Sequence, residues 1–159
     1  MAFYQYKAEL KIPRELNEVW DFISSPVNLK EITPDSMNFT IITELPDLKM
    51  YPGMIIGYRV SPLPGFRTTW ITEITHVLDR KYFIDEQRIG PYAMWHHEHW
   101  IESIKGGVLM TDIVSYQPPM GFLGAVANKL FIRRQIDEIF QYRRLILEKK
   151  FGVYPSLNA

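Results

Sequence analysis

The first periodic segment of the chain, residues 3–11, alternates apolar and polar positions. One side of it carries Tyr4, Tyr6, Ala8 and Leu10. This period of two predicts a half-buried β-strand. Between residues 13 and 34 the apolar positions recur every three or four residues, and Pro13, Pro26 and Pro34 supply start and stop signals. We therefore expect two short helices after the first strand.

The middle of the chain contains further strand-like segments separated by short connections. They lie at about 38–44, 53–61, 67–78, 81–89, 93–104 and 108–116. Short loops between such segments favour antiparallel neighbours. Together with the first strand, these segments predict a seven-stranded antiparallel sheet.

The last periodic segment, from about Gly121 to Phe151, carries apolar residues at helical spacing. A helix of this length spans about 40 Å, enough to cross the whole sheet, and we expect a break in it near Asn128. Its basic side chains are mixed with acidic ones, so we place them on a solvated outer face and not on a membrane-lying helix. These basic residues are Arg133, Arg134, Arg143, Arg144, Lys149 and Lys150.

Hairpin loops determine which residues of neighbouring strands share a face of the sheet. A two-residue turn at Gly106-Gly107 would place His97 opposite Tyr116. At the Gly-Pro loop, a connection of three residues would place Gln87 opposite Trp95, whereas a two-residue loop would shift the pairing by one. The longer loop is favoured because it leaves most of the charged side chains on a single face.

A two-residue turn at residues 79–80 would likewise place His76 opposite Phe83. With these registers the face rich in carboxylates, which includes His96 and Glu98, points to solvent, and the other face points inward. The inward face carries Trp70, Thr72, Ile74, His76, Phe83, Asp85, Gln87, Trp95, His97, His99, Ile101, Asp112, Val114 and Tyr116. Because a strongly twisted sheet around one helix leaves a gap, we expect a ligand cavity beneath this face.

Composition narrows the class of protein. The chain has 159 residues, of which 47% are hydrophobic, and 18 Lys and Arg against 18 Asp and Glu. This length fits one domain, residues 1–159, and the lack of a basic surplus argues against nucleic acid as a partner. No apolar run is long enough to span a membrane. Without cysteine or a signal-peptide pattern, we expect a soluble, cytoplasmic protein.

One stretch, "FIDEQRIGPYAMWHHEHWIE", is followed by "TDIVSYQPPMGFLG" and "IFQYRRLILEKKFG". This pattern resembles the small bacterial ligand-binding proteins of the START-related, pollen-allergen-like SRPBCC superfamily, some of them cell-division-inhibitor-like or polyketide cyclase-like. The matching residues are Phe83, Asp85, Gln87, Gly90, Pro91, Trp95, His97, His99, Asp112, Tyr116 and Gly121. Ile101 stands where the group has Phe. The resemblance implies an α+β helix-grip fold, in which a curved antiparallel sheet wraps around the C-terminal helix.

The expected function is the binding of a small, mainly hydrophobic or amphipathic molecule between the sheet and the long helix. Members of the superfamily bind lipids, polyketides or hormones, or catalyse cyclisation, so the resemblance does not select one activity. The candidate ligand-binding residues are Tyr58, Trp70, Phe83, Asp85, Gln87, Trp95, His97, His99, Asp112 and Tyr116. We expect no cofactor, and the sequence leaves a homodimer open.

Two other functions compete with this hypothesis. Asp85 and His97 are candidates for proton transfer in a cyclase, dehydratase or hydrolase, because burial shifts the pKa of a carboxylate and an adjacent imidazole can exchange a proton. A protein-interaction module is the third alternative, with the inward aromatic residues as plain core and no cavity.

A metal site is a further alternative. His97 and His99 are spaced as two zinc ligands could be, with His76, Asp85 or Asp112 as the third. We favour hydrogen bonds between these histidines and the buried aspartates, so no metal is expected.

The apolar loops "SPLPGF" at 61–66 and "PPMGFLG" at 118–124 either gate the mouth of the cavity or are ordinary turns.

Overall fold

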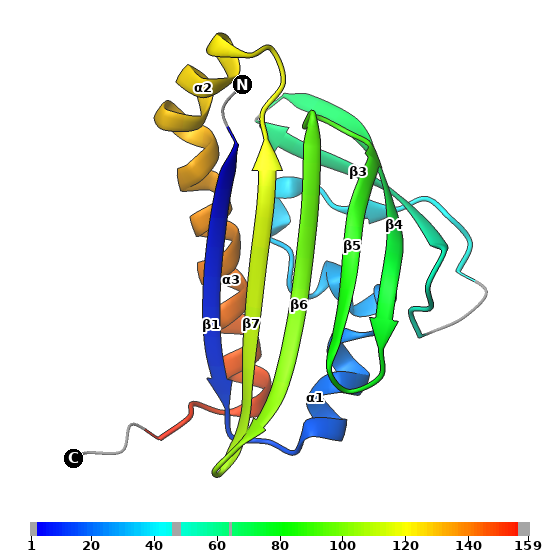
Figure 1. Cartoon of the computed structure of the whole chain (residues 1–159), viewed down its shortest axis with the longest axis vertical. Helices are drawn as coiled ribbons and strands as arrows, with labels where there is room; N and C mark the ends of the chain where they lie inside the picture. The colour runs from blue at the N-terminus through cyan, green and yellow to red at the C-terminus, as the bar shows by residue number, and fades with distance from the viewer. Residues whose placement is uncertain (1–2, 46–48, 64, 156–159) are drawn as a thin grey trace.

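Seven strands pair into one antiparallel sheet in the computed structural model, which describes residues 3–45, 49–63 and 65–155. The strands are β1 (Tyr4–Ile12), β2 (Thr40–Ile41), β3 (Met54–Leu63), β4 (Phe66–Leu78), β5 (Tyr82–Ile89), β6 (Met94–Ile104) and β7 (Gly107–Gln117). Their order across the sheet is β1-β7-β6-β5-β4-β3-β2, so the first and last strands in sequence lie side by side (Figure 1).

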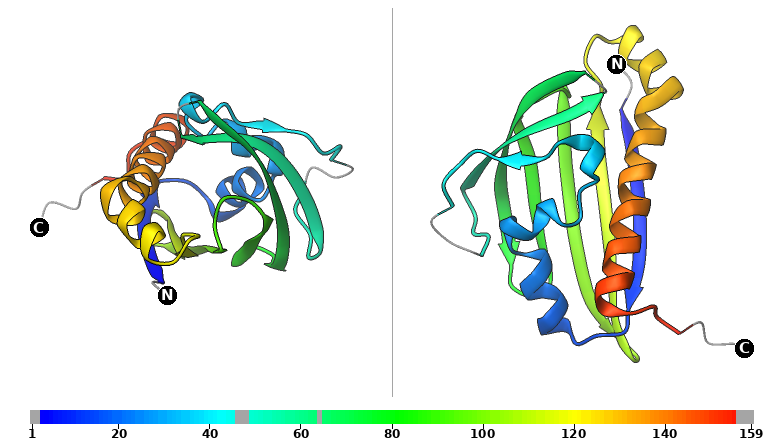
Figure 2. Two further views of the ribbon diagram at one scale, coloured as in Figure 1. Left: turned by 90° about the horizontal axis from the view of Figure 1, so that it is seen from above. Right: turned by 180° about the vertical axis from the view of Figure 1, so that it is seen from behind.

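The helices lie on the concave side of this sheet. They are α1 (Leu16–Ile23), the 3-10 helices η1 (Pro26–Lys30) and η2 (Asp35–Met37), α2 (Phe122–Ala127), the π-helical turn η3 (Asn128–Ile132) and α3 (Arg133–Phe151). Figure 2 shows α3 along β1 and β7, with α1 on the same side of the sheet. The α+β architecture predicted from the sequence, with two short helices after the first strand and a long C-terminal helix, is confirmed. No helix within the described ranges is long and apolar enough to cross a membrane.

The expected break in the C-terminal helix occurs at Asn128 as a π turn. The Asn128 side chain is buried, and its Oδ1 accepts a 2.8 Å hydrogen bond from the hydroxyl of Tyr116 on β7. Extra residues in a helical turn rotate the segments on either side of it relative to each other. The break therefore separates α2, which extends past the end of the sheet in Figure 1, from α3, which packs against it.

The hairpin between β6 and β7 is shifted by two residues from the expected register. Its loop consists of Lys105 and Gly106, and Ile104 pairs with Gly107. A Cβ atom at Gly107 would lie 2.0 Å from the backbone oxygen of Ile12, so only glycine fits where β1 approaches the hairpin. Since a shift of two keeps every side chain on its face, the inward and outward assignments hold although the cross-strand partners change.

This correction changes the partners of both inward histidines. His97 lies opposite Val114 and not Tyr116, and His99 lies opposite Asp112. In the neighbouring hairpin the register expected from the longer loop is confirmed, with Asp85 opposite His97. The two histidines of β6 therefore lie between an aspartate on β5 and an aspartate on β7.

The expected position of His76 is wrong. The β4–β5 loop has three residues, because Leu78 pairs with Tyr82, and Arg80 within it has the left-handed φ of 58° that such loops require. A β-bulge between Ile74 and His76 then restores the expected pairing of Ile74 with Asp85. On β4, the residues between the loop and the bulge therefore face the side opposite to the expected one. His76 is accordingly exposed on the outer face.

The core beneath the sheet is closed at one end by α1 and the last turns of α3. Trp20 contacts Phe83 edge-to-face at 6.2 Å, and Phe22 contacts Phe151 in the same way at 5.6 Å. Leu147 on α3 is 1% exposed within this cluster. These contacts fix the last turns of α3 against the sheet at this end of the core.

We predict that Leu147→Ala lowers the free energy of unfolding by roughly 2 to 5 kcal/mol, because it leaves a void in a close-packed core. Leu145→Ala on the same helix should change it by less than about 0.5 kcal/mol, since Leu145 is 64% exposed. Urea denaturation followed by tryptophan fluorescence measures both. Equal losses for the two variants would contradict this packing of α3.

Candidate functional site

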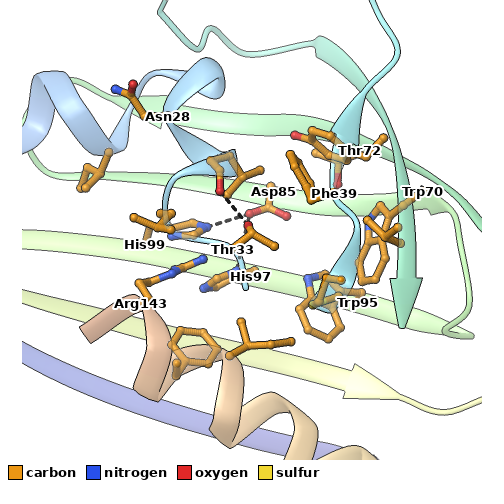
Figure 3. A pocket seen from close by; sticks show the side chains of 18 of the residues that line it. Asn28, Thr33, Phe39, Trp70, Thr72, Asp85, Trp95, His97, His99 and Arg143 are labelled. Atoms are coloured by element: carbon orange, nitrogen blue, oxygen red, sulfur yellow. Dashed lines mark hydrogen bonds and ion pairs between the residues drawn. The ribbon is translucent and has the colours of Figure 1, made fainter. Parts of the chain in front are cut away.

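A cavity lies between the concave face of the sheet, η1 and α3 (Figure 3). The volume of this cavity is about 160 Å³. Voids larger than a water molecule are few in close-packed protein cores. The aromatic part of its wall consists of Phe22, Phe39, Tyr58, Trp70, Phe83, Tyr92, Trp95 and Phe140. The cavity is thus a distinct feature of the fold and is bounded mainly by large side chains.

One end of the cavity is an aromatic wall. Trp70 and Trp95 meet edge-to-face at 5.2 Å, and Tyr92 lies 4.8 Å from Trp95 and 5.7 Å from Trp70. The Gln87 side chain holds this corner in place: its Nε2 donates to the carbonyl of Tyr92 at 2.7 Å, and its Oε1 accepts from the Tyr92 backbone N–H at 3.2 Å. Such interlocked rings keep one shape and offer a rigid apolar surface.

The other end of the cavity is polar and centres on His99. Its Nε2 is 2.7 Å from Oδ2 of Asp85, and its Nδ1 is 2.9 Å from Oδ1 of Asp112. Carboxylates this close to both ring nitrogens favour the imidazolium form of His99. Burial alone would lower the pKa of His99, but its contacts with the two carboxylates raise it overall. The ring also stacks on Phe83 at 4.1 Å.

His97 lies beside His99 but carries no charge. Its Nε2 donates a 2.9 Å hydrogen bond to Asp112 Oδ1, whereas its Nδ1 is 3.7 Å from Asp85 Oδ2, too far for a second hydrogen bond. Burial, and then the positive charge of His99, lower the pKa of His97 to about 4. The expectation that the two histidines pair with the buried aspartates is therefore confirmed, with unequal protonation of the two rings.

Arg143 on α3 completes the cluster, which corrects its expected place on the solvated outer face. It is 8% exposed, and its Nη1 donates to Asp112 Oδ1 at 3.1 Å. Burial alone would raise the pKa of Asp112, but Arg143 and the two imidazoles hold it well below its usual range. The cations His99 and Arg143 thus balance the anions Asp85 and Asp112, as buried charges require.

Asp85 is the more exposed of the two aspartates and lines the cavity, whereas Asp112 does not. The Asp85 side chain keeps 17% of its surface exposed, against 8% for Asp112. Oδ2 is taken by His99, and Figure 3 shows the other carboxylate oxygen directed away from that ring. Burial opposes ionisation, yet the hydrogen bond from His99 and the nearby charges lower the pKa of Asp85. An ionised oxygen is therefore available to a guest in the cavity.

Comparison with known proteins bears on the fold. No family model matches the chain, and no curated protein matches its sequence. Among solved structures, TTHA0849 from Thermus thermophilus aligns with a TM-score of 0.70 and 15% identity over 93% of this chain and 97% of that one. Ginseng major latex-like protein 151 from Panax ginseng gives 0.68 and 10% over 94% and 97%, and Ara h 8.0201 gives 0.59 and 11% over 93% and 99%.

These alignments run over nearly the whole of both chains and include the curved sheet and the long helix. The chain has the helix-grip fold. At identities this low the likeness concerns the fold alone, and the fold implied by the resemblance to SRPBCC proteins is confirmed.

The helix-grip arrangement brings most of the candidate residues to one cavity. Those in its wall are Tyr58, Trp70, Phe83, Asp85, Trp95, His97 and His99. The structure places the other three behind the wall. Gln87 supports Tyr92, Asp112 lies behind the histidines, and Tyr116 is fully buried with its hydroxyl bonded to Asn128. Of the two apolar loops, Pro62 lines the cavity, and 118–124 contributes no described lining residue.

Some residues of the site were not predicted from the sequence, chiefly Arg143 and Tyr92. A signal for Arg143 exists, because it continues the buried stripe of Ile136, Phe140 and Leu147 at helical spacing. An arginine at such a position, on a helix that faces inward aspartates, predicts a buried ion pair. Tyr92 belongs to the hairpin loop, whose conformation no periodicity describes.

We predict that Arg143→Leu lowers the free energy of unfolding at neutral pH by about 3 to 5 kcal/mol, because the two buried carboxylates then keep only one compensating cation, His99. Arg134→Leu should cost less than about 0.5 kcal/mol, since the Arg134 side chain is 83% exposed. Chemical denaturation of both variants measures the difference. Indistinguishable stabilities would show that Arg143 does not balance the buried carboxylates.

Proposed function

We propose that the protein, acting as one domain over residues 1–159, binds a small, mainly apolar molecule in the cavity beneath its sheet. The observation that carries the proposal is the pairing of an aromatic wall with one ionised carboxylate oxygen, that of Asp85, facing the same space. Ligand sites combine a large apolar surface with a few polar groups that fix orientation. An amphipathic guest satisfies both parts.

The polar end favours a guest with a hydrogen-bond donor. The donors of His99 and Arg143 that reach the aspartates are used within the cluster, whereas Asp85 keeps an acceptor free. A hydroxyl or an amine therefore complements this end, and a carboxylate would meet like charge. The alternative of an interaction module with a filled core receives no support from a cavity of this kind.

The family resemblance agrees with this proposal, since superfamily members hold lipids, polyketides or hormones in the corresponding space. The lack of cysteine suits a protein of the cytoplasm, where we place this function.

We predict that N-phenyl-1-naphthylamine, an apolar fluorescent probe, binds to the EDTA-treated protein with increased emission. Ile139→Trp should abolish this binding, because Ile139 lines the cavity and the larger side chain fills it. Leu145→Trp is the matched control: it adds the same ring to the outer side of the same helix and should leave binding unchanged. If neither the wild type nor the control binds the probe, the proposed function is wrong.

We predict that 1-naphthol displaces the probe more strongly than naphthalene does, by about 1 kcal/mol, the usual net contribution of one hydrogen bond. Asp85→Asn should reduce this advantage, because its amide can present a donor where the carboxylate presented an acceptor. Competition titrations in EDTA measure it. An unchanged advantage in the variant would remove Asp85 from the site.

The rival function, proton transfer by Asp85 or His97, gives a different result. Native mass spectrometry of the freshly purified protein can identify a retained molecule. For an enzyme, Asp85→Asn would keep that molecule bound while its turnover is lost. For a binding protein, the variant would bind that molecule more weakly.

A further inference from the structure

We infer that Asp85, His97 and His99 bind a divalent transition-metal ion at the polar end of the cavity. Each residue offers one ligand atom, and the three atoms lie within 4.8 Å of one another. All three side chains line the cavity, so an ion there would be reached from it (Figure 3). The inference goes beyond the proposed function, which requires no ion.

Asp112 lies behind both imidazole rings. Its Oδ1 lies 2.9 Å from Nε2 of His97 and 2.9 Å from Nδ1 of His99. The opposite nitrogen of each ring therefore faces Asp85 Oδ2, at 3.7 Å for His97 Nδ1 and 2.7 Å for His99 Nε2. Histidines that bind metals commonly donate their second N–H to such a carboxylate, which fixes the tautomer and the ring orientation. Arg143 holds Asp112 in this role at 3.1 Å.

One ring nitrogen of the cluster, Nδ1 of His97, is not used in a hydrogen bond within it. His97 is 5% exposed, and within the described part of the chain its Nδ1 forms no hydrogen bond. This nitrogen lies 3.7 Å from Asp85 Oδ2. Because the cluster does not use it in a hydrogen bond, it is available as a ligand to an ion between His97 and Asp85.

The spacing of the ligand atoms also suits an ion. Metal–ligand distances of about 2.0 to 2.2 Å place neighbouring ligand atoms roughly 3 to 3.5 Å apart. The separations from Asp85 Oδ2, 2.7 and 3.7 Å, fall on either side of that range, so small side-chain rotations suffice. On binding, the ion takes the place of the proton on His99 Nε2, which is released to solvent, and no electron is transferred.

The donor set defines the class of ion. Two imidazole nitrogens and one carboxylate oxygen suit first-row divalent ions such as Zn²⁺, whereas Mg²⁺ and Ca²⁺ prefer oxygen ligands alone. Three protein ligands would leave further coordination positions for water or a guest from the cavity that these residues line.

The experiment uses untagged protein, stripped with EDTA, dialysed and titrated with Zn²⁺ by calorimetry. The wild type should bind a single equivalent that stays bound through gel filtration. Asp112→Asn should weaken binding roughly 10- to 100-fold, because the rings lose their orienting carboxylate. His97→Gln should abolish stoichiometric binding.

The matched control is the double variant His76→Gln/His96→Gln, which removes the other two of the four histidines in the chain. His76 is exposed, and His96 lies on the outer face against Glu86. This variant should bind Zn²⁺ as the wild type does. Every imidazole signal of this variant belongs to His97 or His99. Imidazole N–H resonances shifted by bound Co²⁺ therefore report these two ligands. This measurement does not depend on whether His97→Gln folds.

Failure to retain Zn²⁺ in the stripped wild type would overturn the inference. Binding that is lost in the double variant would place the ion on the outer face and overturn it as well. Because the probe titrations are performed in EDTA, neither result bears on whether the cavity binds an apolar guest.

Discussion

The charge balance of one buried cluster governs how the sheet and the long helix meet. The imidazolium of His99, on β6, lies between Asp85 on β5 and Asp112 on β7, and Arg143 reaches Asp112 from α3. An isolated buried charge is far more costly than a paired one, so each of these four groups is tolerated only because the others are present. Three adjacent strands and the helix are thereby tied together at a single level of the structure.

This constraint also separates the two ends of the cavity. The cluster concentrates the titratable groups at one end, and the rings of Trp70, Tyr92 and Trp95 close the other. The charged groups of the cavity wall are thereby gathered at one end, and the aromatic surface at the other. The two ends of the cavity differ in polarity because the charges of the cluster must lie together to balance one another.

Much of this could be predicted from the sequence, because within a regular strand a side chain's face depends on whether its position is odd or even relative to its neighbours. Faces were therefore predicted correctly around β6 even though its pairing with β7 is shifted by two. The β-bulge that turned His76 to the outer face left no such signal. Exact partners depend on which residues form the turn, and the two-residue turn expected at Gly106-Gly107 lies at Lys105 and Gly106. Arg143 was assigned to the surface because basic residues usually lie there, although its spacing along α3 pointed inward. Tyr92 was missed because it lies in a loop.

The β-bulge at Thr75 limits how the β4–β5 hairpin can change during evolution. The longer loop after Leu78 turns the end of β4 by one position, and the bulge turns it back before Ile74. Losing a residue at only one of these places would rotate Asp85 or its neighbours out of the interior. Related sequences should therefore gain or lose residues at the two places together, and an alignment that permits a single gap in this hairpin would match inner positions to outer ones.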